Sequence, residues 1–314
     1  MSLTELPRIS VITPALDGEA YISDALTSLQ EQDYPDFESI VIDGGSVDNT
    51  VSISGSYPFC EVIVRHGAGL YAALNEGLRA STGAIICFLN SDDLLTPGIL
   101  RNVGKLFTSN PDLEIVGGQA VLFEDDASGV RQVIDDYSRF AGRTLEPDTL
   151  LFGAPIINAH FFRADIFKKT GNFDTSYRLA ADREFMLRCY MHGLKVAYVP
   201  ALAYQYRRHP GSLTLNRKKT NTRTMGLEHL RIADELRNSG NEELRRQSSR
   251  AWDDAALTVM AACLRNLQLA DLVKFCFRFS TESPLFMLRL PLALAGKIQR
   301  RIQARRQHAG NGTT

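Results

Sequence analysis

The sequence lacks the cysteine motifs, the long apolar runs and the leader pattern that would assign it to several common classes of protein. Its five cysteines form no CxxC pair and most lie in apolar surroundings, as buried free thiols in a reducing compartment do. No uninterrupted apolar run approaches the roughly 18 to 20 residues that cross a bilayer. Residues 1–8 carry no signal-peptide pattern either. We therefore expect the bulk of the protein to be cytoplasmic.

An excess of charge of one sign is also missing. The chain has 35 Lys and Arg against 36 Asp and Glu, which gives a formal net charge of -1. This balance produces no global field that would favour nucleic acid as a partner. The 314 residues, 44% of them hydrophobic, are enough for one large domain with an appendage or for two small domains.

Glycine-rich phosphate loops are absent as well. No GxGxxG motif follows the first predicted strand, and no GxxxxGK[ST] motif occurs anywhere in the chain. The sequence therefore indicates neither a dinucleotide-binding fold nor a P-loop. A phosphate site in this chain would need a metal ion rather than a glycine-rich cradle.

What is present is an alternation of strands and helices over about the first 110 residues. Short β-rich runs predict strands at residues 9–13, 37–42, 62–64 and 84–89, and helical segments separate them. This alternation predicts a parallel sheet with right-handed crossovers. Ligands of such sheets bind at the carboxyl ends of the strands. Three of the predicted strands end there in polar residues: Thr13 with Pro14, Asp43, and Asp92 with Asp93.

The strand at residues 84–89 leads into two adjacent carboxylates, Asp92 and Asp93. Neighbouring acids repel each other, a cost that a bound cation removes, and hard oxygen donors select Mg²⁺ or Mn²⁺. Alternatively, Asp92 caps the helix that begins near Pro97, and Asp93 is a solvated loop residue. The spacing alone leaves both interpretations open.

The middle of the chain predicts further strands at residues 114–123, 130–134, 157–162, 196–199 and 203–206. A segment without helix breakers, residues 182–192, predicts a helix that ends before Gly193. Asp182 lies in its first turn, where the helix dipole favours a carboxylate. Alternatively, Asp182 is only an acidic residue at the start of this helix. Residues 207–211, which include His209, predict an exposed basic loop.

From about residue 221 the pattern changes to continuous helix. No acidic residue occurs after Glu282, while basic residues follow at Lys297, Arg300, Arg301, Arg305 and Arg306. This composition fits an interfacial amphipathic segment in peripheral contact with anionic lipid. It also fits a docking helix with a solvated basic tail.

A series of short motifs between residues 7 and 215 resembles the family 2 glycosyltransferases. The motifs, in order, are Ser10-Val11-Ile12-Thr13-Pro14, Ile40-Val41-Ile42-Asp43-Gly44-Gly45-Ser46, Gly69-Leu70-Tyr71, Leu74-Asn75, Phe88-Leu89-Asn90-Ser91-Asp92-Asp93, Ala180-Ala181-Asp182 and Tyr206-Arg207-Arg208-His209-Pro210-Gly211-Ser212. The resemblance implies a GT-A fold, an α/β architecture with a Rossmann-like, mostly parallel sheet flanked by helices. We expect this domain over residues 1–220, followed by an α-helical C-terminal extension over residues 221–314.

The resemblance also implies a reaction. Family members of this kind carry out an inverting transfer of a sugar from a nucleoside diphosphate donor to an acceptor hydroxyl, with Mn²⁺ or Mg²⁺. By similarity, Asp93 would coordinate the metal that bridges the two phosphates, and Asp92 would lie near the ribose and the metal. Asp182 matches the position of the general base.

Other positions would contact the nucleotide. By similarity, Asp43 would accept a hydrogen bond from the nucleobase, and Thr13, Pro14 and Asp17 would line the nucleotide pocket. His209 would supply a further metal or diphosphate contact. Leu16 stands where relatives commonly have an aromatic residue and Asp17 where they commonly have Asn. The nucleobase and the donor sugar therefore stay open, with a UDP-sugar as the first candidate.

The expected acceptor is a glycan or a lipid-linked glycan, in the synthesis of a surface polysaccharide or of a lipid-linked product. Two other functions remain open. A nucleotidyltransferase that makes the sugar nucleotide would share the sheet, although the glycine-rich basic loop that it needs after the first strand is missing. A non-catalytic subunit that binds sugar nucleotides would keep the donor site and have no use for Asp182 as a base.

Overall fold

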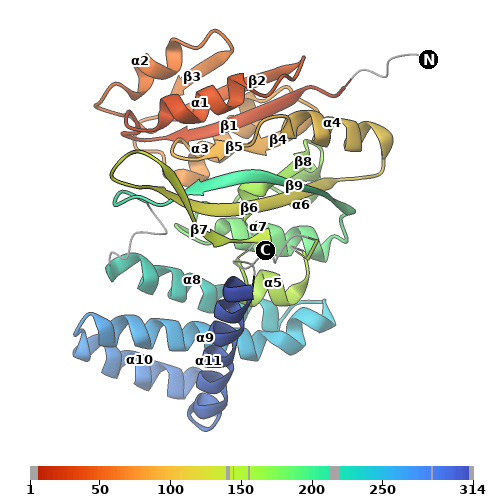
Figure 1. Cartoon of the computed structure of the whole chain (residues 1–314). Coiled ribbons are helices and arrows are strands. Elements are labelled where there is room, and N and C mark those ends of the chain that lie inside the picture. Colours follow the sequence, from red (N-terminus) through yellow and green to blue (C-terminus); the bar gives the residue numbers. More distant parts are fainter. Residues whose placement is uncertain are drawn as a thin grey trace. The chain divides into compact units, whose positions relative to one another are not determined.

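The computed structural model describes residues 6–138, 142–143, 145–154, 156–212, 219–283 and 286–310, and the side chains of 219–220, 287 and 300–310 lie outside that description. Residues divide by their contacts into two compact units, Met1–Arg208 and His209–Thr314. Figure 1 shows an α/β first unit and an all-helical second unit. The division of function between residues 1–220 and 221–314 stays a prediction.

Among the described residues, the first unit contains one nine-stranded sheet. Its strands are β1 (Ile9–Ala15), β2 (Phe37–Asp43), β3 (Cys60–Val64), β4 (Ile85–Phe88), β5 (Leu94–Leu95), β6 (Ile115–Asp125), β7 (Arg131–Asp136), β8 (His160–Arg163) and β9 (Val196–Arg207). The order is β3-β2-β1-β4-β8-β6-β9-β5, and β7 pairs with β6. The strands β1 to β4 are parallel to one another, as the alternation of strands and helices predicts.

The other half of the sheet is mixed. Strand β8 runs antiparallel between β4 and β6, whereas β6 and β9 are parallel. The prediction of two separate strands at residues 196–199 and 203–206 is wrong, because Pro200 and Ala201 continue the extended backbone and β9 is one strand of 12 residues. The two-residue strand β5, antiparallel to β9, was not expected, since two residues give no periodic signal.

Helices cover the two faces of the parallel half (Figure 1). They are α1 (Ile22–Gln30), α2 (Thr50–Gly55), α3 (Leu70–Ala80) and α4 (Ile99–Ser109). Helices α1 and α4 pack with Ile9 and Val11 on one face, and α3 packs with Ile40 and Ile42 on the other. The approach of α3 to β1 requires glycine, because a Cβ at Gly77 would collide with the side chain of Ile12.

The remaining helices of the first unit follow the mixed half of the sheet. They are α5 (Pro147–Phe152), a 3₁₀ turn (Ile157–Ala159), α6 (Ile166–Thr170) and α7 (Ala181–Met191). The 3₁₀ turn occupies the first half of the strand predicted at residues 157–162, so β8 begins only at His160. A cluster of buried rings anchors α7: Phe185 stacks on Phe167 with 5.2 Å between ring centroids and lies 4.9 Å from Phe173.

The second unit consists of α8 (Lys219–Arg237), α9 (Glu242–Arg265), α10 (Leu269–Glu282) and α11 (Phe286–Gly310). Its core forms around Trp252 of α9, whose ring lies 5.3 Å from that of Phe279 and 5.4 Å from that of Phe286. Arg289 of α11 donates two hydrogen bonds to the Asp253 carboxylate, at 2.7 and 2.9 Å. In the part of the chain that is described, no helix combines the length and apolar character needed to cross a membrane.

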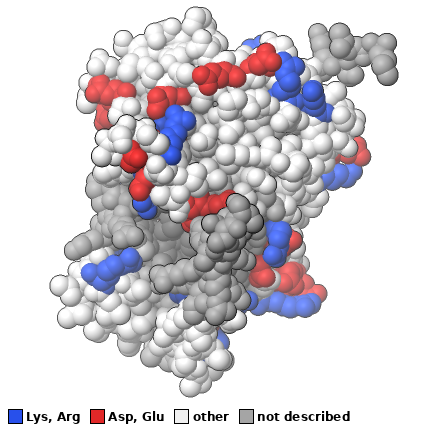
Figure 2. Space-filling model, viewed as in Figure 1, with Lys and Arg blue, Asp and Glu red and all other residues white. Residues whose placement is uncertain are grey.

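Acidic and basic side chains are interspersed on the face of the molecule that Figure 2 shows. Some charged side chains of the first unit form ion pairs: Arg8 lies 3.0 Å from both Asp36 and Glu38, and Arg208 pairs with Glu124 at 2.5 Å. Exposed pairs of this kind are each worth little, about 0 to 1 kcal/mol. They therefore shape the local surface potential more than the stability.

Candidate functional site

The carboxyl ends of β1, β2 and β4 lie at one edge of the sheet, because these strands are parallel neighbours. Hydrogen bonds tie the loops after β1 and β2 together at this edge. Asp17 accepts from the Val47 amide at 3.0 Å through Oδ1, and its own amide donates to Ser46 Oγ at 2.9 Å. The Gly18 amide donates to Thr50 Oγ1 at 2.8 Å. The two loops therefore form one surface.

The predicted nucleotide residues of β1 lie on or beside this surface. Thr13 is fully buried, and its hydroxyl has no hydrogen-bond partner among the described residues. Pro14 is half-buried, and Asp17 is exposed with a φ of 50°. Leu16 is also exposed. Because Thr13 has no exposed surface, its contact to the nucleotide stays a prediction.

Asp43, the predicted nucleobase contact, is fully buried at the end of β2. Its Oδ1 accepts from the amides of Gly45 and Ser46 at 2.9 and 2.8 Å, and its Oδ2 accepts from the Ser46 hydroxyl at 2.5 Å. Gly45 allows this tight turn because its φ of 98° is one that other residues rarely adopt. Asp43 thus stabilises the turn after β2, and its contact to the nucleobase stays a prediction.

Asp93, the predicted metal ligand, is enclosed by the protein in this structure. Its carboxylate is fully buried, and both oxygens are engaged by the protein. Oδ2 accepts from the Tyr204 hydroxyl at 2.6 Å and from Asn90 Nδ2 at 2.8 Å, and Oδ1 accepts from the Arg207 amide at 2.7 Å. Burial, reinforced by the charge of Asp92, raises the pKa of Asp93 well above its ordinary value. Asp93 therefore links the turn after β4 to β9, and its contact to a metal stays a prediction.

The neighbouring Asp92 is half-buried, so its side chain remains within reach of a ligand. Its backbone carbonyl accepts a hydrogen bond from Arg207 Nε at 3.0 Å. The turn that carries Asp92 is thus held through its main chain and through Asp93. Of the acid pair, Asp92 is the residue whose position fits a contact to the donor.

Arg207 organises this region, and the prediction that it lies in an exposed loop is wrong. It is the last residue of β9 and is 3% exposed. Its guanidinium donates to Asp24 Oδ2 at 2.6 Å and to Asp125 Oδ2, and lies 4.8 Å from the centre of the Tyr21 ring. Sequence spacing could not reveal this, because the partners come from α1, β6 and the turn after β4.

The side chains that could ligate a metal limit the kind of metal site that the residues could form. Within the described ranges, no group of three or more His, Cys, Asp or Glu side chains gathers as a metal cage. Protein-bound Mg²⁺ commonly uses one or two carboxylates together with phosphates of the substrate. The residues therefore fit a cation that Asp92 would share with a diphosphate, and they do not fit a metal enclosed by the protein alone.

Asp182, the predicted base, lies in the first turn of α7 and is half-buried. Its Oδ1 accepts from the Tyr71 hydroxyl at 3.2 Å and from the Arg183 amide at 2.8 Å. Burial raises the pKa of Asp182, and these two hydrogen bonds oppose the rise. Because Tyr71 lies in the first turn of α3, directly after parallel strand β3, Asp182 reaches the same sheet edge as Asp92.

His209 is the first residue of the second unit. It is half-buried, and its Nδ1 accepts from the Gly211 amide at 3.2 Å. The Ser212 hydroxyl accepts from the His209 amide at 3.0 Å, which closes a tight turn. Its predicted contact to metal or diphosphate stays a prediction.

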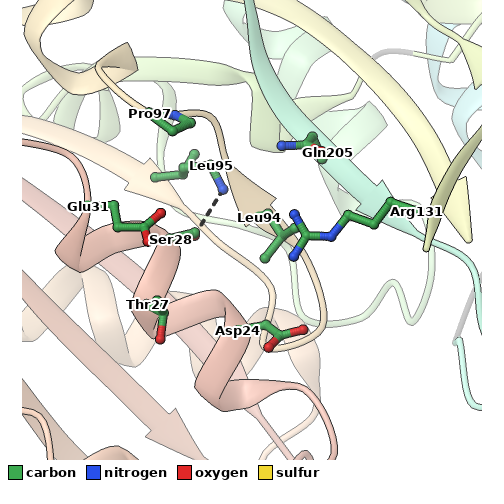
Figure 3. Close-up of a pocket in the computed structure, with 9 residues that line it drawn as sticks. All are labelled: Asp24, Thr27, Ser28, Glu31, Leu94, Leu95, Pro97, Arg131 and Gln205. Atoms are coloured by element: carbon green, nitrogen blue, oxygen red, sulfur yellow. Dashed lines mark hydrogen bonds between the residues drawn. The ribbon is translucent and has the colours of Figure 1, made fainter. Parts of the chain in front are cut away.

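Two cavities of the first unit lie away from these residues. One, of about 200 Å³, has Asp24 and Glu31 of α1 on one side and Arg131 and Gln205 on the other, over Leu94 (Figure 3). The second, of about 550 Å³, lies at the opposite edge of the sheet, where Thr82 and Gly83 precede β4. Asp24 links the first cavity to Arg207, but no predicted site residue lines either cavity.

Comparison with known protein families gives one match over about half of the chain. Residues 10–169 match the family described as glycosyl transferase family 2. Among curated proteins, a PGL/p-HBAD biosynthesis glycosyltransferase of Mycobacterium bovis is 29% identical over 207 residues, which cover 64% of this chain and 73% of that protein. A putative glycosyltransferase, EpsH of Bacillus subtilis, is 26% identical and covers 68% and 65% respectively.

Solved structures share the fold. S. aureus TarS 1-349 in complex with UDP-GlcNAc superposes with a TM-score of 0.61 at 20% identity, covering 97% of this chain and 92% of that one. The mannosyltransferase PcManGT of Pyrobaculum calidifontis, in complex with GDP-Man and Mn²⁺, gives a TM-score of 0.57 at 18% identity, covering 93% and 85%. The sheet with its flanking helices is therefore of the GT-A type, as predicted.

Proposed function

The chain belongs to glycosyl transferase family 2, and we propose that it catalyses inverting transfer of a sugar from a nucleoside diphosphate donor to an acceptor hydroxyl. The observation that carries the proposal is the hydrogen bond from Tyr71 to Asp182. It holds a carboxylate of raised pKa at the edge of the sheet where β1, β2 and β4 end. A base on the acceptor and a polar donor surface are what such a transfer needs.

The candidate residues fall into two groups, one that acts on the acceptor hydroxyl and one that binds the nucleotide of the sugar donor. Asp182 accepts the proton of the acceptor hydroxyl, and its raised pKa brings its proton affinity closer to that task. Thr13, Pro14 and Asp17 contact the nucleotide, and Asp43 and Arg207 keep the surrounding turns in place. Asp92 would hold the Mn²⁺ or Mg²⁺ ion, which would stabilise the negative charge of the diphosphate leaving group.

The donor proposal rests on the two structural neighbours. TarS is in complex with UDP-GlcNAc and PcManGT with GDP-Man, so UDP is the first candidate and GDP the second. Calorimetry with UDP and with GDP, in Mn²⁺ and then in EDTA, tests both. We expect one diphosphate to bind only with metal, and Asp92→Ala to weaken it more than Asp93→Asn does. Metal-independent binding that Asp92→Ala leaves intact would remove the metal from the proposal.

The acceptor proposal rests on the relatives. One is named for PGL/p-HBAD biosynthesis, and EpsH is named a glycosyltransferase only. We infer a glycan or lipid-linked acceptor, with the chain acting on the cytoplasmic side of a membrane. Asp182→Asn separates the enzyme from a non-catalytic subunit: it should abolish transfer and keep donor binding in the enzyme and change nothing in a subunit. Release of pyrophosphate from a nucleoside triphosphate would instead indicate a nucleotidyltransferase.

A peripheral membrane contact is the second part of this proposal, and it falls on α10 and α11. Leu269, Val273 and Phe277 recur at every fourth residue of α10 and are 61, 69 and 74% exposed. On α11, Leu288 and Leu292 follow the same spacing and are each 76% exposed. A single exposed leucine is ordinary, but two apolar helix faces in succession favour a partner.

The charge around these helices favours an anionic bilayer as that partner. No acidic residue follows Glu282. Lys297 is not available to lipid as the sequence suggested, because it donates to the Asp254 carboxylate at 3.0 Å. The attraction would therefore rest on Lys274, which is exposed, and on the basic residues after 299, whose side chains lie outside the described residues.

Flotation with vesicles that contain phosphatidylserine tests this contact. We expect wild type to float with the vesicles and the double variant Phe277→Glu, Leu292→Glu to stay behind. Val133→Glu, at an exposed apolar position of the first unit, is the matched control and should float. Equal flotation of all three proteins would contradict a lipid-binding face on α10 and α11.

A further inference from the structure

The two oxygens of the Asp182 carboxylate have different surroundings. Oδ1 accepts both hydrogen bonds, from the Tyr71 hydroxyl at 3.2 Å and from the Arg183 amide at 2.8 Å. Across the described parts of the chain, no donor from another residue bonds Oδ2. A carboxylate held in this way cannot rotate freely, so the oxygen that faces a substrate is set by the protein.

Tyr71 is itself held firmly. It is 5% exposed, and its ring lies 5.7 Å from that of Phe173. One helical turn later, Asn75 Nδ2 donates to the Phe173 carbonyl at 2.8 Å, and the Phe173 amide donates to Asn75 Oδ1 at 3.0 Å. Tyr71 and Asn75 share one face of α3, and together they fix the segment that leads to Asp182.

Other charged groups near α7 are mostly engaged elsewhere. The Arg183 guanidinium donates to the carbonyls of Leu150 and Gly153, while its charge lowers the pKa of Asp182. Glu184 and Arg188 pair with each other. On the helices packed against α7, the charged residues are Asp148 of α5 and Lys168 and Lys169 of α6, and Lys169 pairs with Glu114.

We propose that Tyr71 is a positioning residue that binds Oδ1 of Asp182 and thereby presents Oδ2 to the acceptor hydroxyl. This inference rests on the proposed function of Asp182 as the base. In the transfer, the acceptor O–H bond breaks and its proton moves to Oδ2, while the acceptor oxygen forms the bond to the anomeric carbon. The bond from that carbon to the diphosphate breaks, and its electron pair leaves with the diphosphate. The Tyr71 hydroxyl keeps its proton throughout.

Tyr71→Phe tests the proposal, since it removes one oxygen and keeps the ring that packs on Phe173. The lost hydrogen bond favours the ionised carboxylate, so its removal raises the pKa of Asp182 further. Because transfer requires ionised Asp182, we expect the acid limb of the pH–rate profile to move up by about one pH unit. Because Oδ2 is also no longer held toward the acceptor, kcat on the plateau above the acid limb should fall by roughly tenfold, while the KM of the donor stays unchanged.

Tyr34→Phe is the matched control. Tyr34 is 6% exposed, and its hydroxyl donates to the Pro7 carbonyl at 2.6 Å, so the variant loses a buried phenol bond remote from Asp182. We expect it to lower the melting temperature and to leave the pH profile where it is. If Tyr71→Phe does the same, the hydroxyl has a structural role only and the proposal is overturned.

A titration that needs no turnover separates this inference from the proposed function. The ¹³C signal of the Asp182 carboxyl carbon is assigned by its loss in Asp182→Asn, and its pKa is measured in wild type and in Tyr71→Phe. An upward shift in an active enzyme supports both proposals. An upward shift in a protein without transfer activity contradicts the role of Asp182 as base and still supports the hydrogen bond from Tyr71 to Asp182. No shift overturns the role of Tyr71 whether or not the protein is active.

Discussion

Asp93 is a buried and Asp182 a half-buried carboxylate of the first unit, and each accepts a hydrogen bond from a tyrosine hydroxyl. Burial raises the pKa of both. They differ in how their oxygens are used: Asp93 has three donors on two oxygens, whereas Asp182 has two donors on one. A raised pKa is therefore common to both residues, and we expect the distribution of their hydrogen bonds to distinguish the proposed base from the structural carboxylate.

The largest effect is expected from a variant that removes the charge of Asp182. We expect Asp182→Asn to reduce transfer by about 10²- to 10⁴-fold, the range for a lost general base. Its stability should change little, because the amide can still accept from Tyr71 and Arg183. Initial rates and thermal unfolding measure the two effects. A variant with full activity would place the base elsewhere.

Asp93→Ala should instead lower the stability of the protein much more than Asp182→Asn does. Removing the carboxylate leaves the Tyr204 hydroxyl, the Asn90 amide and the Arg207 amide without their acceptor. Buried donors left without partners are costly, and we expect a loss of about 3 kcal/mol in the free energy of unfolding. Urea unfolding measures this loss. A variant as stable as wild type would show that the turn after β4 is held by Arg207 alone.

A smaller effect compares the two tyrosines directly. Tyr204→Phe removes one of three donors to Asp93, so we expect a loss of about 1 kcal/mol in stability. Transfer at neutral pH should stay within about twofold of wild type, since no proton is moved at Asp93. Tyr71→Phe should instead lower the transfer rate more than the stability. If both variants lost activity equally, the difference between the two carboxylates would disappear.

The pH dependence of the wild type gives the mildest test. The base must be ionised, so activity is present above the pKa of Asp182 and is lost as the pH falls through it. Since burial raises that pKa, the acid limb should lie above the ordinary range of an aspartate. A profile of kcat over KM for the acceptor shows this, and an acid limb at the ordinary aspartate pKa would contradict it.

The parallel half of the sheet could be predicted from sequence, because each of its strands is a short apolar run followed by a helix. The position of Asp182 in the first turn of α7 could be predicted from the lack of helix breakers after it, whereas its role as base was implied only by the family resemblance. Strand β5 has only two residues, and β9 continues through Pro200, so neither gave a usable pattern. The uses of Asp93 and Arg207 depend on partners more than 80 residues away in the chain. Such contacts leave no local signal.

Arg207 lies next to the last residue of the first unit, and His209 begins the second. The chain therefore enters the second unit within two residues of a side chain bonded to α1, β6 and the turn after β4. Arg207 thus holds the end of the first unit through contacts made within that unit. We expect that shortening or exchanging the extension leaves these turns undisturbed, so that the proposed membrane contact and the proposed transfer reaction could change independently in evolution.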